Sequence, residues 1–169
     1  IARFGTAAQQ ERDLPGVTQI EVSPFGELTY EKALRSILRQ DPQVLMIGAI
    51  RAAAVASLAI QAALSGHRLL CTLHAATPAT AIARLLEMGV EPYQITSALF
   101  GVIAQRLLRR KTQDGYKGRV PVAEFARSNA EVRKLILSRS DAEQLAAMLQ
   151  TQKDYQTLRE AAESLAAVG

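Results

Sequence analysis

Two short apolar segments end on residues that are able to bind a ligand. Residues 44–47 are apolar and are followed by Gly48, and the apolar segment 69–73 is followed by His74. If both segments are parallel strands, their carboxyl ends should meet at the edge where open α/β sheets bind ligands. A nucleotide-hydrolysis site would place carboxylates at this edge, to hold a metal ion and to position water. The sequence places Ala49 and Ala52 there instead.

The residues around these segments resemble the secretion ATPases that drive type II secretion and type IV pilus assembly. The family pattern L-R-x-x-L-R-Q-D-P-D-x-x-x-x-G-E-I-R-D is matched by Leu34, Arg35, Leu38, Arg39, Gln40, Asp41, Pro42, Gly48, Ile50 and Arg51. The pattern A-x-x-A-A-x-T-G-H…T-L-H-T-N is matched by Ala59, Ala62, Ala63, Ser65, Gly66, His67, Thr72, Leu73 and His74, and the sequence departs from it at Ala75 and Ala76. Further matches lie in residues 84–85, 88–92, 104–107 and 118–119. The similarity is strong over roughly residues 14–127, which is most of the chain.

The resemblance implies an α/β fold with the C-terminal part of a RecA-type, P-loop NTPase-like core, followed by a small helical subdomain. We expect the ATPase-like body, without its phosphate-binding loop, to cover residues 1–127. The helical subdomain should cover residues 128–169, because the sequence changes there to polar caps followed by apolar stripes.

The departures from the family pattern fall on its acids. The resemblance places the Walker B glutamate of the family at Ala49 and the acids of its Asp box at Ala7 and Ala8. Gln43 stands where an acid opens the Walker B strand, and Ala52 stands where an Asp follows the conserved arginine. A positioned base alone is commonly worth about 10² to 10⁴ in rate, and alanine supplies none. The sequence also contains no G-x-x-x-x-G-K-[ST] loop, which in the family lies upstream of residue 1.

Other residues of the motifs are retained. The resemblance makes Gly48, Arg51, Thr72 and His74 the candidates for nucleotide contact. The family histidine that His74 matches senses the γ-phosphate or couples subunits. From the residues alone, local hydrogen bonds at the start of a loop are the alternative explanation for His74. A surface ion pair is the alternative explanation for Arg51.

Two groups of arginines are candidates for contact with a partner subunit. Arg35 and Arg39 lie on a predicted helix that precedes the first strand. Arg106, Arg109 and Arg110 lie at the predicted end of a helix that begins after Pro92, where a solvated helix end is the alternative explanation. We expect no nucleic-acid binding, because neither interleaved aromatic residues nor a known module accompanies these cations.

Composition places the chain among soluble globular proteins. The 169 residues are 49% hydrophobic and only 5% aromatic, so the core should be aliphatic. The single cysteine, Cys71, excludes an internal disulfide and is expected in the core of a protein from a reducing compartment. Many relatives carry a four-cysteine zinc module, and the short link 111–117 lacks it, so we expect no metal. The net charge of +4 and the lack of a signal peptide or membrane span favour a cytoplasmic protein, peripheral at the inner membrane only through partners.

Caps and periodicity predict the remaining elements. Strands are expected at residues 17–22, 44–47, 68–73 and 119–125, the last as part of a β-ribbon. Thr29 and Thr77 should cap helices, residues 52–64 should form a buried helix, and apolar spacing predicts a helix from Pro92 through Leu107. Ser128 and Ser140 should cap two further helices, and a last helix should cover about residues 155–167.

The loss of acids beside retained motif residues leads to a first hypothesis. The chain is a secretion-ATPase-like domain that does not hydrolyse ATP and acts as a structural or regulatory subunit of a secretion or pilus machine, in a homo- or hetero-oligomeric ring. The alternative is the C-terminal part of an active motor that binds ATP and Mg²⁺ through an upstream phosphate-binding loop, with Asp41 or Glu11 as substitute acids. A third explanation is that the alanines were introduced deliberately.

Overall fold

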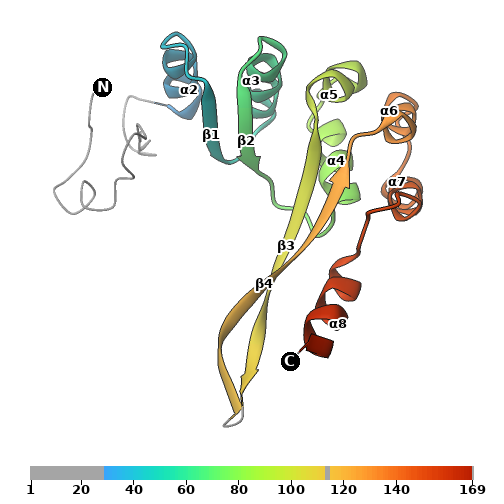
Figure 1. Cartoon of the computed structure of the whole chain (residues 1–169). Coiled ribbons are helices and arrows are strands. Elements are labelled where there is room, and N and C mark those ends of the chain that lie inside the picture. The colour runs from blue at the N-terminus through green and yellow to red at the C-terminus, as the bar shows by residue number, and fades with distance from the viewer. Residues whose placement is uncertain (1–28, 113–114, 169) are drawn as a thin grey trace, which may run out of the picture.

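The computed structural model describes residues 29–112 and 115–168. Ala7, Ala8 and the strand expected at 17–22 lie outside these residues. The described chain is a mixed α/β structure with two separate two-stranded sheets (Figure 1). The elements follow in the order α2 (Tyr30–Leu38), β1 (Val44–Ala49), α3 (Ala53–Leu64), β2 (Arg68–Thr72), α4 (Pro78–Glu87), α5 (Pro92–Ala98), β3 (Gly101–Thr112), β4 (Gly115–Arg127), α6 (Ala130–Leu137), α7 (Ala142–Gln150) and α8 (Leu158–Val168).

The first sheet pairs β1 with β2 in parallel, as the sequence predicts. Leu45 lies opposite Leu69 and Ala49 lies opposite Thr72, with a register shift between Ile47 and Ala49. α2 and α3 lie beside this sheet (Figure 1). Because the strands are parallel, both carboxyl ends lie at one edge, which is the expected arrangement of the motif residues.

Local signals set the ends of the helices around this sheet. The Thr29 side chain accepts a hydrogen bond from the Lys32 backbone N–H, and Thr77 forms a capping box with Thr80. Both predicted caps are therefore confirmed. α3 ends before Gly66, whose φ of 98° is easy only for glycine. The predicted end of this helix at residue 64 is confirmed as well.

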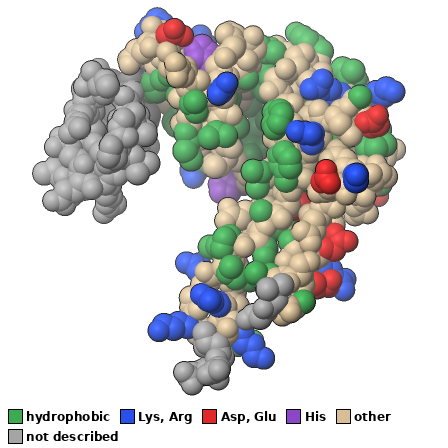
Figure 2. Space-filling model, in the orientation of Figure 1, with side chains coloured by type: hydrophobic (Ala, Val, Ile, Leu, Met, Phe, Trp, Pro, Cys, Tyr) green, Lys and Arg blue, Asp and Glu red, His purple; other side chains and the backbone are tan. Residues whose placement is uncertain are grey.

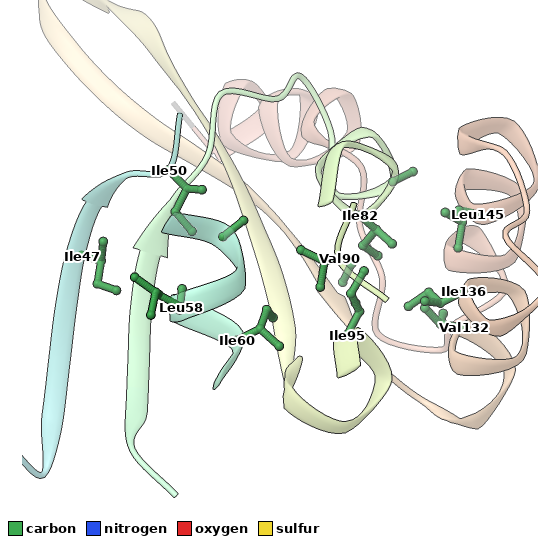
Figure 3. Packing of buried hydrophobic residues seen from close by; sticks show 14 of the residues in the cluster. Ile47, Ile50, Leu58, Ile60, Ile82, Val90, Ile95, Val132, Ile136 and Leu145 are labelled. Carbon is green, nitrogen blue, oxygen red and sulfur yellow. The ribbon is translucent and has the colours of Figure 1, made fainter. Parts of the chain in front are cut away.

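An aliphatic cluster joins the sheet to the helices that follow it. Ile47, Ile50 and Leu58 pack between β1 and α3, and Val90 and Ile95 continue the cluster toward the C-terminal helices (Figure 3). Val132 and Ile136 of α6 and Leu145 and Leu149 of α7 complete it, all fully buried. Helices α6 and α7 thus share one core with the α/β body, and the domain division at residue 127 stays a prediction.

The predicted helix from Pro92 through Leu107 is wrong beyond its first turns. α5 ends at Ala98, and β3 begins at Gly101 and pairs with β4 as a long antiparallel ribbon. Leu99 is already extended, with φ −79° and ψ 116°. The segment contains a glycine and β-branched residues, and its backbone groups find partners in β4, so the apolar spacing that imitates a helix is overridden.

Further corrections concern the C-terminal helices. Their caps are Asn129 and Asp141, one residue after the predicted Ser128 and Ser140, because carboxylate and amide oxygens reach the backbone N–H groups of Val132 and Gln144. The last helix begins at Leu158, three residues later than expected from Tyr155.

One face of the first sheet is uncovered within the described residues. Met46 and Leu70 lie opposite each other on it and are 75% and 62% exposed. Cys71 is also exposed, so its expected place in the core is wrong. Its strand has only one partner strand in the described chain, which leaves its other edge open. None of the helices in the described ranges has the length and apolar character needed to cross a membrane.

Candidate functional site

The carboxyl ends of β1 and β2 bring the predicted nucleotide-contact residues to one edge. Ala49 pairs with Thr72, and the backbone N–H of Ile50 donates to the Thr72 carbonyl oxygen at 2.9 Å. Arg51 follows on the first strand's side and His74 on the second, and both side chains are exposed. The structure therefore gathers Gly48, Arg51, Thr72 and His74 at the same edge.

Gly48 lies at the register shift of β1, beside a residue that the sequence analysis did not select. An added Cβ on Gly48 would lie 3.6 Å from the Tyr30 hydroxyl oxygen. Burial raises the pKa of this hydroxyl, while a hydrogen bond with the Gly48 backbone lowers it. Tyr30 stays a neutral hydroxyl against the strand end, and only its place after the Thr29 cap points to it in the sequence.

Ala52 is the N-cap of α3 and gives that helix no side-chain hydrogen bond. Its φ of −123° and ψ of 145° are those of an ordinary N-cap, but no side-chain oxygen reaches the backbone of the first turn. The first turn of α3 also contains no acidic residue. We call the edge formed by residues 48–52 and 72–76 the motif edge. The positive end of the α3 dipole thus faces the motif edge without a compensating charge from the first turn.

The donors at this edge suit an anion and not a divalent cation. Residues 48–52 and 72–76 supply a guanidinium, a hydroxyl, an imidazole and backbone N–H groups, and none of these residues is Asp or Glu. Magnesium is held by carboxylates and phosphate oxygens, so the edge fits phosphate oxygens but offers no protein ligand for Mg²⁺. Within the ranges 29–112 and 115–168, no three or more His, Cys, Asp or Glu side chains gather as metal ligands.

Gln43 does not join this edge. It lies just before the amino end of β1, at the opposite end of the strand from Ala49, and its side chain is exposed. An acid at this position would be separated from Ala49 by the length of the strand, about 3.3 Å per residue. Asp41, weighed as a substitute acid, precedes the same end and has a φ of 50°.

Arg35 and Arg39 lie near the amino ends of β1 and β2, as Gln43 does, at the opposite end of the strands from the motif edge. Both line a shallow hollow of about 430 Å³ between α2 and α3, together with Gln61, Ser65 and His67. Arg35 forms an ion pair with Glu31 at 3.0 Å, and Arg39 caps the end of α2. The structure therefore does not bring these arginines to the predicted nucleotide residues.

The basic cluster lies on the ribbon and does not end a helix, so the helix-dipole explanation for it is wrong. Arg106 of β3 donates to the carbonyl oxygen of Ala76 at 3.4 Å, which ties the ribbon to the loop after His74. Arg109 lies further along the strand, with its guanidinium 4.7 Å from the centre of the Tyr116 ring. Arg110 is exposed beside it.

A buried acid on the ribbon is a second feature that the sequence analysis missed. Glu124 is 5% exposed, accepts a hydrogen bond from the Tyr155 hydroxyl, and accepts another from the Leu158 backbone N–H at 3.2 Å. These contacts fasten the start of α8 to β4. The alternation of residues along the strand could have predicted its burial, since Glu124 shares its strand face with the buried Val122 and Ala126.

Comparison with known proteins places this geometry in context. The family described as "Type II/IV secretion system protein" matches residues 9–169. The type II secretion system protein HxcR of Pseudomonas aeruginosa is 41% identical over 146 residues, which are 75% of this chain and 31% of that protein. The type IV pilus assembly ATPase PilB of Thermus thermophilus is 51% identical over 100 residues, which are 59% of this chain and 11% of that protein. The chain thus spans a third or less of the length of these relatives.

Solved structures show the same architecture. The ATPase DotB of Legionella pneumophila has a TM-score of 0.68 at 26% identity, over 83% of this chain and 39% of that one. The pilus retraction motor PilT with bound ADP has a TM-score of 0.63 at 28% identity, over 80% of this chain and 43% of that one. The expected α/β fold of P-loop NTPases is confirmed by these likenesses.

Proposed function

Because this chain belongs to the type II/IV secretion system protein family, we propose that it is an ATPase-like subunit that does not hydrolyse ATP. It acts as a structural or regulatory member of a type II secretion or type IV pilus machine, in a homo- or hetero-oligomeric ring. Its place in the cell is the cytoplasm, at the inner membrane through its partners.

One observation supports this proposal above the others. At the edge where β1 and β2 end, Ala49 lies opposite Thr72, and every side chain that the edge gathers is a donor or is apolar. Phosphoryl transfer depends on groups that hold the metal ion and position the attacking water. Arg51, Thr72 and His74 can contact an anion. Residues 48–52 and 72–76 contain no carboxylate that could hold the metal ion or position the water.

Partner contact falls to the arginines away from this edge. Arg35 and Arg39 line the hollow beside His67, and Arg109 and Arg110 stand exposed on the ribbon. Guanidinium groups recognise carboxylates with two parallel hydrogen bonds, so acidic side chains of a neighbouring subunit are the matching chemistry.

The alternative is the C-terminal part of an active motor. It is favoured by the retained Arg51, Thr72 and His74 and by the length of the relatives, of which this chain spans only a part. In that case the phosphate-binding loop and the acids lie elsewhere in the polypeptide. ATP and Mg²⁺ are then cofactors of the whole protein.

Calorimetric titration of the chain 1–169 with ATP and Mg²⁺ tests the proposal. We expect weak binding or none, because the described edge offers donors without a phosphate cradle or a metal ligand. Titration with ATP in EDTA is the matched control, since loss of the metal should change nothing. Low-micromolar affinity that depends on Mg²⁺ would contradict the proposal.

A further inference from the structure

Within the part of the chain that the structure describes, the β3–β4 ribbon has one covered face and one open face. Residues opposite each other in an antiparallel pair share a face, and the face alternates along each strand. Ala104 pairs with Glu124 on the covered face, against which α8 lies (Figure 1). The open face carries the pairs Ile103 with Phe125, Gln105 with Ala123, Leu107 with Pro121 and Arg109 with Arg119. We call these eight residues the outer ribbon face.

Apolar and cationic side chains are segregated along the outer ribbon face. Ile103, Leu107 and Phe125 are 67%, 53% and 44% exposed, in a strip nearest the body. Its far end carries the exposed cations Arg109 and Arg119, and the exposed Arg110, Lys111 and Lys117 lie close to them near the tip of the ribbon (Figure 2). None of these cations forms an ion pair with a described residue. The charges are therefore available to an acidic partner.

We propose that the outer ribbon face binds an amphipathic α-helix of a partner protein. The apolar stripe of the helix lies on Ile103, Leu107 and Phe125, and acidic residues at one end of the helix lie over Arg109 and Arg119. This inference rests on the partner-binding role proposed above and names the chemistry of the partner.

The dimensions of the face match one helix. Two paired strands lie about 5 Å apart, so with their side chains they present a face about as wide as one helix, about 10 Å. From Ile103 to Arg109 the strand rises by about 20 Å, which corresponds to roughly 13 helical residues. The covered face sets the precedent, because α8 packs against β4 and is held by the bond from Leu158 to Glu124.

A helix fits these observations better than a lipid surface. The two strands of the ribbon cross in Figure 1, and strong twist of this kind prevents its face from lying flat against a plane. A membrane that touched the tip would meet the cations and leave Leu107 and Ile103 in water, although membrane-binding elements bury their apolar residues deepest. A helix of finite length can contact the apolar strip and the cations at once.

The test uses a fluorescein-labelled synthetic peptide and the full chain. The peptide has a leucine stripe at helical spacing and glutamates in its last turn, and a scrambled peptide of the same composition lacks the stripe. We expect the striped peptide to bind at least about tenfold more tightly than the scrambled one by fluorescence anisotropy. Its affinity should fall as the salt concentration rises.

Variants locate the binding surface. Leu107→Gln and the double change Arg109→Glu with Arg119→Glu should each weaken binding about tenfold. Arg133→Glu on α6, an exposed arginine away from the ribbon, should leave the affinity unchanged and serves as the matched charge control. All of these side chains are exposed, and thermal unfolding of each variant checks that the fold is kept.

Several results would overturn the inference. These are equal binding of the scrambled peptide, indifference to the outer-face changes, and binding to vesicles with phosphatidylglycerol but not to the peptide. Self-association in light scattering that Leu107→Gln abolishes would assign the face to a second copy instead. The measurement contains no nucleotide, so its failure leaves the proposed lack of hydrolysis intact, and active turnover would leave peptide binding intact.

Discussion

Two alanines at one sheet edge stand where the resemblance places acids of a hydrolysis site. Ala49 and Ala52 keep the backbone of that edge intact, because neither position needs its side chain to form β1 or to start α3. The chemical effect is local. Ala49 offers no carboxylate in the space beside Thr72, and Ala52 leaves the first turn of α3 without a side-chain cap.

An acid introduced at Ala52 should stabilise the protein. In Ala52→Asp the carboxylate accepts a hydrogen bond from the first turn of α3, where the N-cap dihedral angles are already suitable. We expect the free energy of unfolding to rise by about 1 kcal/mol, measured by urea denaturation. Ala52→Asn supplies the cap without the charge and should give most of the same gain. No gain from either substitution would show that the start of α3 is not the N-cap described here.

Tyr155→Phe should destabilise the protein by about 1–3 kcal/mol, because it leaves the buried Glu124 carboxylate without one of its donors. Tyr93→Phe is the matched control, since Tyr93 is 61% exposed. It should be nearly neutral in the same denaturation experiment.

The effect of Tyr155 should also depend on pH. Burial first, and Glu124 second, raise the pKa of Tyr155 in the folded protein. Above about pH 10 the unfolded chain loses this proton while the folded chain keeps it, so the unfolded state binds fewer protons and stability falls as the pH rises. The stability from this raised pKa is therefore fully present below about pH 10. The difference between wild type and Tyr155→Phe should shrink between pH 9 and pH 11, and a constant difference would contradict the role of the hydroxyl.

At the scale of elements, the sequence predicts what local chemistry decides. Thr29, Thr77 and Gly66 mark helix ends by side-chain caps or by a left-handed backbone, and both parallel strands follow from short apolar segments. The first strand of the ribbon could not be predicted in this way, because Val102, Ile103 and Leu107 fit helical spacing as well as strand pairing. Only contact with β4, which is distant along the chain, selects the strand. Placing Glu124 beside Tyr155 needs that same long-range register.

The pairing of β3 with β4 makes one glycine irreplaceable. A Cβ on Gly101 would lie 2.7 Å from Phe125 Cε2 and 2.9 Å from the Ala126 carbonyl oxygen, and the backbone atom cannot move away without breaking the ladder. Gly101→Ala should therefore lower the free energy of unfolding by about 1–3 kcal/mol, which a lower melting temperature would show. Gly48→Ala is the matched control, because the atom nearest to its added Cβ is Tyr30 Oη, at an ordinary contact distance of 3.6 Å. The site should therefore tolerate the methyl group. Equal effects of the two substitutions would contradict the described register.

At the scale of the whole molecule, the described surfaces differ in their chemistry and lie apart from one another. The motif edge keeps donors for an anion and lacks carboxylates, while the hollow of Arg35 and Arg39 and the ribbon lie away from it. The family and the fold could be predicted from the sequence, because the motifs that carry them are local and dense. The uncovered faces of β2 and of the ribbon could not, since exposure depends on which elements are packed nearby.

Steady-state phosphate release from the full-length protein, with ATP and Mg²⁺, tests the central claim most directly. The account predicts no release above background. It also predicts none from the same protein with the single change Ala49→Glu, because the groups that hold the metal ion, the water and the γ-phosphate act as a unit. Turnover by the unmodified protein comparable to that of an active secretion ATPase would contradict the account.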